Sequence, residues 1–153
     1  MRFARSIGSI FVAAAAVALL SGCAAADPDV SGLQAELNGL PGVNGSQVVV
    51  EHPGAPWNTR IVVNMYLDDP SQATVVSVVE AAAPALADDE AVRQHPVSIF
   101  FVDGQVGDFP AGPKPSRTIP LSNDTYAALG LTPAAGRSLE LTPDDLRRLA
   151  GRG

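Results

Sequence analysis

The clearest alternation of hydrophobic and polar positions lies in residues 60–67, which read Arg-Ile-Val-Val-Asn-Met-Tyr-Leu. Every second residue from Ile61 to Leu67 is large and apolar, so the pattern predicts a strand with one buried face. A shorter alternation covers residues 47–51, and a loop of residues 52–59 separates the two segments. Two consecutive strands with a short link predict an antiparallel hairpin.

Two segments have the three- and four-residue spacing of amphipathic helices. The first covers residues 31–39, and Ser31 is its expected N-cap. The second follows Asp69, which is expected to cap it, and Pro84 should kink or end it in its last turn. This second helix carries an apolar stripe made up of Val75, Val79, Ala82 and Leu86.

The segment 97–102 is apolar on nearly every position and predicts a central strand, placed parallel to an earlier strand by a right-handed crossover. Beyond a Gly- and Pro-rich loop we expect weaker elements: strands at 118–121 and 138–141, a short helix at 124–129, and a final helix capped by Thr142. The predicted fold class is α+β. It has a small mixed sheet in α-β-β-α-β order, helices packed on one face and a C-terminal helical tail.

The first residues form a three-part leader. Arg2 and Arg5 provide a positive start, and residues 7–20 are uncharged and mostly apolar. This apolar run is shorter than the roughly 20 residues that a permanent membrane-spanning helix needs. Small residues follow at Ser21 and Gly22, where a signal peptidase requires slim side chains.

The end of this leader, Leu-Ser-Gly-Cys at residues 20–23, resembles the lipobox of bacterial lipoproteins. The resemblance implies that Cys23 is acylated on its sulfur and becomes the first residue of the mature chain. It also implies a location at the cell membrane, anchored by lipid on the extracytoplasmic face. The expected organisation is a signal peptide (1–22), a lipidated tether (23–30) and one α+β domain (31–153).

The sequence leaves two alternatives to acylation of Cys23 open. The segment 24–26 is itself an Ala-x-Ala site, and cleavage there would discard Cys23 and release the protein. An uncleaved signal anchor is disfavoured by the short apolar run. Since Cys23 is the single cysteine, an intrachain disulfide is excluded, and acylation would account for an otherwise reactive exported thiol.

Charge narrows the range of partners. The whole chain has a formal net charge of −6, and loss of Arg2 and Arg5 with the leader makes it −8. An acidic domain repels phosphate backbones and anionic lipids, so we expect no nucleic-acid partner and assign membrane attachment to the lipid. The richness in Ala, Gly, Val, Asp and Arg, with a single lysine, is typical of a high-GC genome such as that of an actinobacterium.

The sequence holds few groups suited to catalysis. His52 and His95 lie next to prolines at predicted strand ends, without metal-ligand spacing, and we interpret them as exposed residues. A Gly-x-Ser-x-Gly nucleophile turn and a phosphate-binding glycine loop are absent. Three Asp-Asp pairs lie at helix ends, where capping explains them better than calcium binding. We therefore expect no enzyme activity, no metal and no cofactor.

Two loops are candidates for a binding surface. The first, residues 52–59, carries the single tryptophan, Trp57, whose amphipathic ring could anchor a partner. The plainer interpretation, which we favour, folds Trp57 back over the sheet edge to help close the core. The second loop contributes Phe109, Lys114 and Arg117. Its prolines would reduce the conformational entropy that the loop loses on binding.

The helix-strand-strand-helix-strand order is similar to that of small envelope modules such as the BON domain and the ring-building domains of secretins. This similarity concerns element order alone. It implies binding to an envelope protein, to a lipid surface or to further copies of the chain. The expected function is a membrane-anchored, non-enzymatic binding or adaptor module. The alternatives are an envelope hydrolase whose site assembles only in the fold, and a carrier of a small apolar ligand.

Overall fold

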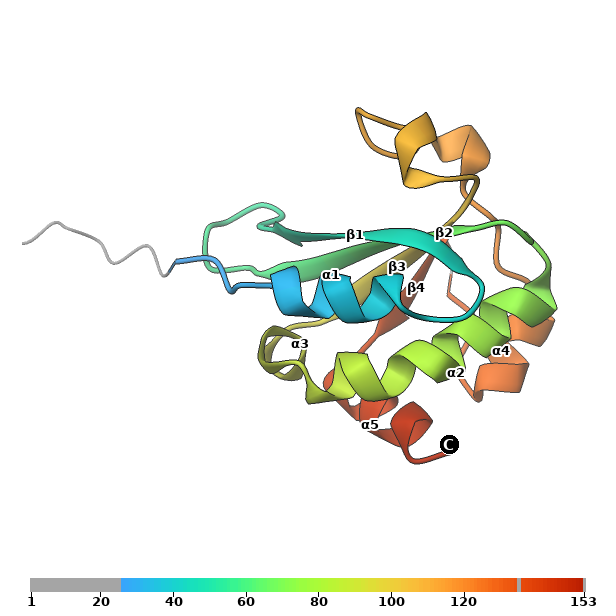
Figure 1. The fold of residues 1–153 in the computed structure, drawn as a ribbon. Helices are drawn as coiled ribbons and strands as arrows, with labels where there is room; N and C mark the ends of the chain where they lie inside the picture. The colour runs from blue at the N-terminus through green and yellow to red at the C-terminus, as the bar shows by residue number, and fades with distance from the viewer. Residues whose placement is uncertain (1–25, 135, 153) are drawn as a thin grey trace, which may run out of the picture.

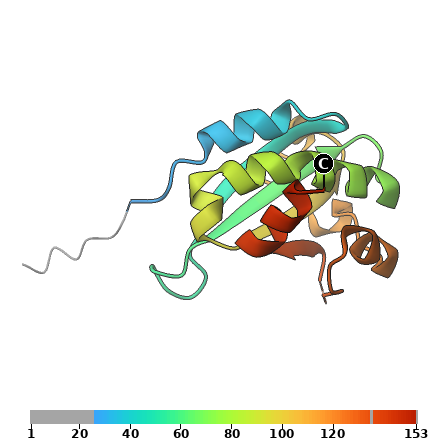
Figure 2. The same cartoon turned by 90° about the horizontal axis from the view of Figure 1, so that it is seen from below.

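The computed structural model describes residues 26–134 and 136–152, and the expected lipidation site, Cys23, lies outside this part. A four-stranded sheet forms the centre of the molecule (Figure 1). The helices cover one face of the sheet, and the opposite face is left open except where the segment between β3 and α4 folds over it (Figures 1 and 2).

The elements follow in chain order: α1 (Ser31–Asn38), β1 (Val43–Glu51), β2 (Arg60–Leu67), α2 (Gln72–Asp88), α3 (Glu90–Gln94), β3 (Val97–Asp103), the 3₁₀ turns η1 (Val106–Asp108) and η2 (Pro115–Arg117), α4 (Asn123–Leu129), β4 (Ser138–Leu141) and α5 (Pro143–Ala150). The strands lie in the order β1-β2-β3-β4. β1 and β4 pair antiparallel with their neighbours, and the two central strands are parallel. The predicted α+β class, mixed sheet and C-terminal helix are therefore confirmed.

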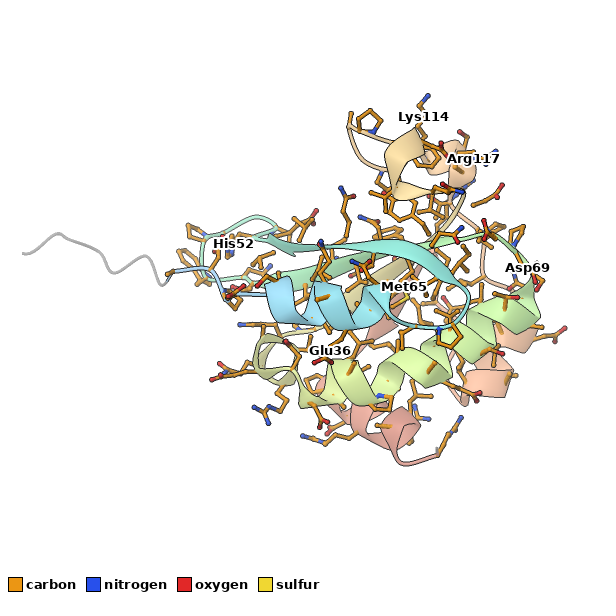
Figure 3. All side chains as sticks on the ribbon, viewed as in Figure 1. Glu36, His52, Met65, Asp69, Lys114 and Arg117 are labelled. Carbon is orange, nitrogen blue, oxygen red and sulfur yellow. The ribbon has the colours of Figure 1, made fainter. Side chains whose placement is uncertain are left out.

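The core lies between the sheet and α2. Ile61, Val63 and Met65 of β2 belong to one buried cluster with the predicted stripe of α2, from Val75 to Leu86. Met65 points from the sheet toward the helices (Figure 3). The alternation in β2 thus identified the helix-covered face correctly, because that side of the strand packs against the layer of helices.

The start of α2 differs from the prediction. Ser71, and not Asp69, is the N-cap: its hydroxyl accepts from the Thr74 amide at 3.2 Å. The Asp69 carboxylate instead accepts from the Ser71 and Thr74 hydroxyls. These hydrogen bonds, the one from Thr74 foremost, hold the pKa of Asp69 below its usual range.

Pro84 does not end α2, which continues to Asp88. Pro84 lies on the exposed side of the helix, so water can satisfy the carbonyl group that loses its amide partner. The last turn is retained because Leu86, on the other side, is fully buried. Packing of this turn therefore outweighs the local defect.

Other local predictions also need correction. Val30 takes the N-cap position of α1, so Ser31 is inside the helix, where its amide donates to Asp29. Residues 118–121 form a single bridge between Thr118 and Val102, not a strand. β1 begins earlier than predicted and contains an irregularity near Gly45, whose φ of +154° suits glycine. The capping of α5 by Thr142 is as predicted.

Candidate groove on the uncovered face of the sheet

A groove of about 320 Å³ lies on the uncovered face of the sheet, beneath the segment that links β3 to β4. Its lining residues come from β1, β2 and β3 and from this segment: Glu51, Val62, Asn64, Phe100, Pro113, Pro115, Thr118 and Arg137. The strands supply the floor, and the proline-rich segment 104–117, which rises above the sheet in Figure 1, supplies a wall.

The floor is formed by the side chains of β2 and β3 that point away from the helices. Val62 and Asn64 alternate with the core residues of β2, and Asn64 pairs in register with Phe100 of the parallel strand β3. Asn64 is only 8% exposed, yet it lines the groove. Its amide offers one donor group and one acceptor on a floor that also carries the apolar side chains of Val62 and Phe100.

The wall is held by a small second core. The ring of Phe109 stacks on that of Tyr66, with centroids 5.9 Å apart, and Val102 and Val106 complete the cluster. The Tyr66 hydroxyl donates to Gln47 at 3.2 Å, and burial raises the pKa of Tyr66. Tyr66 is therefore expected to stay neutral and to serve as a fixed platform for the loop.

Two arginines hold the rest of segment 104–117 in place through hydrogen bonds and an ion pair. Arg117 donates from Nε to the Asp103 carbonyl at 3.1 Å and forms an ion pair with the Asp103 carboxylate at 3.2 Å. Arg137, which precedes β4, donates to the Pro115 carbonyl at 2.6 Å. The wall is thus preordered by contacts at both ends, which reduces the entropy that a ligand would otherwise have to remove.

The groove has opposite charges on its lining. Glu51 comes from the end of β1, and Arg137 comes from the segment that leads into β4. An apolar floor with a few convergent polar groups is the usual composition of a ligand site. The arrangement can therefore hold an apolar group and orient polar atoms attached to it.

The structure divides the predicted binding surface. Lys114 and Arg117 lie on the loop over the uncovered face, whereas His52, at the start of the β1–β2 loop, lies apart from them at the left end of the sheet (Figure 3). Lys114 is exposed, and Arg117 is engaged with Asp103. Phe109 is only 7% exposed, so its ring does not form an open part of this surface. Its ring finds an apolar partner on the sheet and supports the wall from within.

Trp57 also differs from the interpretation that we favoured. Its side chain is 85% exposed and does not fold back over the sheet edge. The β1–β2 loop extends beyond the ends of the strands, so it projects away from the sheet (Figure 1). The sequence could not distinguish these outcomes, because both the Trp57 loop and the Phe109 loop are rich in proline and glycine.

The histidines occupy separate places. His52 bonds to Asp27 at 2.7 Å and lies 3.3 Å from the Thr59 hydroxyl, while His95 caps the end of α3. Within residues 26–134 and 136–152, no group of three His, Cys, Asp or Glu side chains is placed to hold a metal. Over the same residues, no helix has the length and apolar character needed to cross a bilayer.

Sequence reasoning missed the groove itself. The outward face of β2, with Val62 and Asn64, could have been identified from the same alternation that defined the core. Arg137 gave no signal, because it lies in a short linker far along the chain from the strands that it approaches. No protein-family model, curated protein or solved structure matches this chain.

Proposed function

We propose that this protein is a membrane-anchored envelope lipoprotein whose domain, residues 31–153, is a non-enzymatic binding or adaptor module. The groove on the uncovered face carries this proposal. Its volume of about 320 Å³ falls in the usual range of ligand sites, about 300–1,000 Å³. The leader that resembles a lipobox supports the anchor at Cys23 and a location on the extracytoplasmic face of the cell membrane.

The chemistry of the groove favours part of an envelope protein as the ligand. Val62 and Phe100 suit an apolar side chain, and Asn64 can pair with a backbone amide or carbonyl beside it. Glu51 and Arg137 would then fix the direction of the bound segment through its charges. A site of this size would hold a few side chains, and not a whole folded surface.

Site-specific crosslinking tests this role in intact envelopes. A photoreactive benzoyl-phenylalanine at the position of Pro113 is expected to give a discrete adduct, whose partner is identified by mass spectrometry. The matched control carries the same group at Glu80, which is exposed on the outer side of α2. Phe100→Ala should abolish the Pro113 adduct while the far-ultraviolet circular dichroism remains unchanged.

Equal adducts from both positions, or none from Pro113, would contradict binding in the groove.

The apolar floor also supports the second candidate, a carrier of a small apolar ligand. Native mass spectrometry of protein extracted from membranes distinguishes the two candidates. A carrier would show a constant added mass that Phe100→Ala removes, whereas a protein-binding module would not.

The anchor has its own test. Mass spectrometry of the mature N-terminus should find a diacylglyceryl group on Cys23, because stable attachment needs two or more acyl chains. Cys23→Ala should leave the precursor uncut at this position or release the protein to the medium. A mature chain that begins at Asp27 would show that cleavage follows residues 24–26 and would exclude the anchor.

A further inference from the structure

The β1–β2 loop presents Trp57 to the surroundings with no protein surface to cover it. Among the described residues, only Val49 and Trp57 are large hydrophobic residues classed as exposed, and Trp57 is the more exposed of the two at 85%. Solvent exposure of an indole ring is unfavourable, so a ring displayed in this way is suited to contact with something outside the domain.

The loop holds this display in place. The Asn58 amide donates to the Ala55 carbonyl at 3.0 Å, which closes a turn around Trp57. The Asn58 side chain donates to the Pro53 carbonyl at 2.8 Å. These bonds, with two prolines in the loop, keep Trp57 on a stiff support that loses little entropy when it makes a contact.

The chain outside the structure begins at this same end of the molecule. The first described residues, which precede α1, lie at the same end of the molecule as the β1–β2 loop in both views (Figures 1 and 2). Asp27 bonds directly to His52 at the base of the loop, at 2.7 Å. Cys23 is four residues before Asp27, and four residues span at most about 14 Å.

We propose that Trp57 rests in the interfacial layer of the membrane to which Cys23 is attached, and thereby fixes the orientation of the domain. The inference rests on the proposed lipid anchor, which places the bilayer within a short tether of the loop. Tryptophan favours the headgroup level, where its ring is buried and its indole N–H stays hydrated. Residues 53–59 carry no charged side chain, so approach to lipid removes no ionic group from water.

A membrane fits this surface better than a folded protein partner does. A protein interface buries about 800 Å² on each side, and the loop offers one aromatic ring with small residues around it. A lipid anchor alone leaves the domain free to rotate. A second contact at Trp57 would limit this rotation and fix the direction of the loop of Lys114 and Arg117, which rises from the uncovered face of the sheet in Figure 3.

The single tryptophan makes the test direct, because all indole emission of the mature protein comes from Trp57. The acylated protein is reconstituted into vesicles of phosphatidylethanolamine and phosphatidylglycerol, and flotation measures its attachment. We expect a blue-shifted emission and about twofold quenching by brominated lipid. Aqueous iodide should quench the emission less than it does for the protein in detergent-free solution after removal of the lipidated N-terminus.

The control variant combines Trp57→Phe with Lys114→Trp, which moves the tryptophan to an exposed position on the loop over the uncovered face. Its emission should stay water-like and remain accessible to iodide in the same vesicles. Protein that floats with vesicles but shows water-like Trp57 emission would overturn the membrane contact and leave the anchor intact. A blue shift without quenching by brominated lipid would assign Trp57 to a protein contact instead, and failure to float would overturn both proposals.

Discussion

The two faces of β2 differ in what covers their side chains. On the helix-covered face, Ile61, Val63 and Met65 have no exposed surface and belong to the main core. On the other face, Val62 and Asn64 line the groove and keep 7% and 8% of their surface exposed. The first face is covered by a layer of helices that includes α1 and α2. The second is covered only where the segment after β3 folds over it.

This difference separates the surface that stabilises the fold from the surface that carries the groove of the proposed function. Packing against α2 buries a continuous apolar cluster, which provides the main driving force for folding. The uncovered face has only the small cluster of Tyr66, Val102 and Phe109 to hold its wall in place. A groove can persist there because the fold does not need that surface to be fully packed.

The largest effect is expected for a charge on the covered face. Val63→Asp should destabilise the domain by about 4 kcal/mol or more, a large part of the stability of a typical domain, because the carboxylate would be buried without a partner. The matched control is Val49→Asp, on the uncovered side of the neighbouring strand β1, where the side chain is 43% exposed. It should cost about 1 kcal/mol or less. Thermal unfolding followed by circular dichroism measures both variants, and similar losses would contradict the division between the faces.

The predictable part of the fold follows from this division. The positions of β2 and the stripe of α2 were read from the sequence, since burial against a second layer imposes a strict period on both. The capping of α5 by Thr142 was also readable, because the cap and its partner Asp145 lie within one helical turn. Such features depend on neighbours in the chain or on one large apolar interface.

The features that could not be predicted depend on competition between residues that look equally suited to one role in the sequence. Asp69 and Ser71 are both good N-caps, and the Asp69 carboxylate satisfies two hydroxyl groups instead of the helix amide. Phe109 and Trp57 lie in loops of similar composition, and only Phe109 meets an apolar platform. The groove was missed because Arg137 reaches Pro115 through tertiary structure alone.

The second prediction concerns the two loop aromatics. Phe109→Ala should cost about 2–3 kcal/mol, somewhat less than in a fully enclosed core, because the Tyr66 cluster is small and lies at the surface. Amide hydrogen exchange should become faster across residues 104–117 and remain slow in β2. Trp57→Ala should change stability by about 0.5 kcal/mol or less, since the ring packs on nothing within the domain. Equal losses would mean that Trp57 has a role in folding.

A smaller effect is expected where the groove wall meets the linker before β4. Arg137→Gln removes a guanidinium donor from the Pro115 and Thr118 carbonyls and should cost about 1 kcal/mol. Amide exchange at Thr118 should become faster. Arg93→Gln, at an exposed position in α3, controls for loss of one positive charge. If both variants lose the same stability, net charge and not the wall contact would explain the result.

The smallest effect is expected at the start of α2, at the edge of the covered layer, and it should depend on pH. The ionised Asp69 carboxylate accepts hydrogen bonds from Thr74 and Ser71, which lower its pKa in the folded protein. This stabilisation is present above the pKa of the unfolded chain, about 3.9, and is lost as the pH falls through the lower folded value. Asp69→Asn should therefore be slightly less stable than the parent at pH 7 and should approach it in acid. Asp68→Asn removes the same charge one residue earlier, so chemical denaturation of both variants across pH isolates the hydrogen-bonded carboxylate. A difference between the two variants that is constant with pH would show that the Asp69 charge does not stabilise the turn.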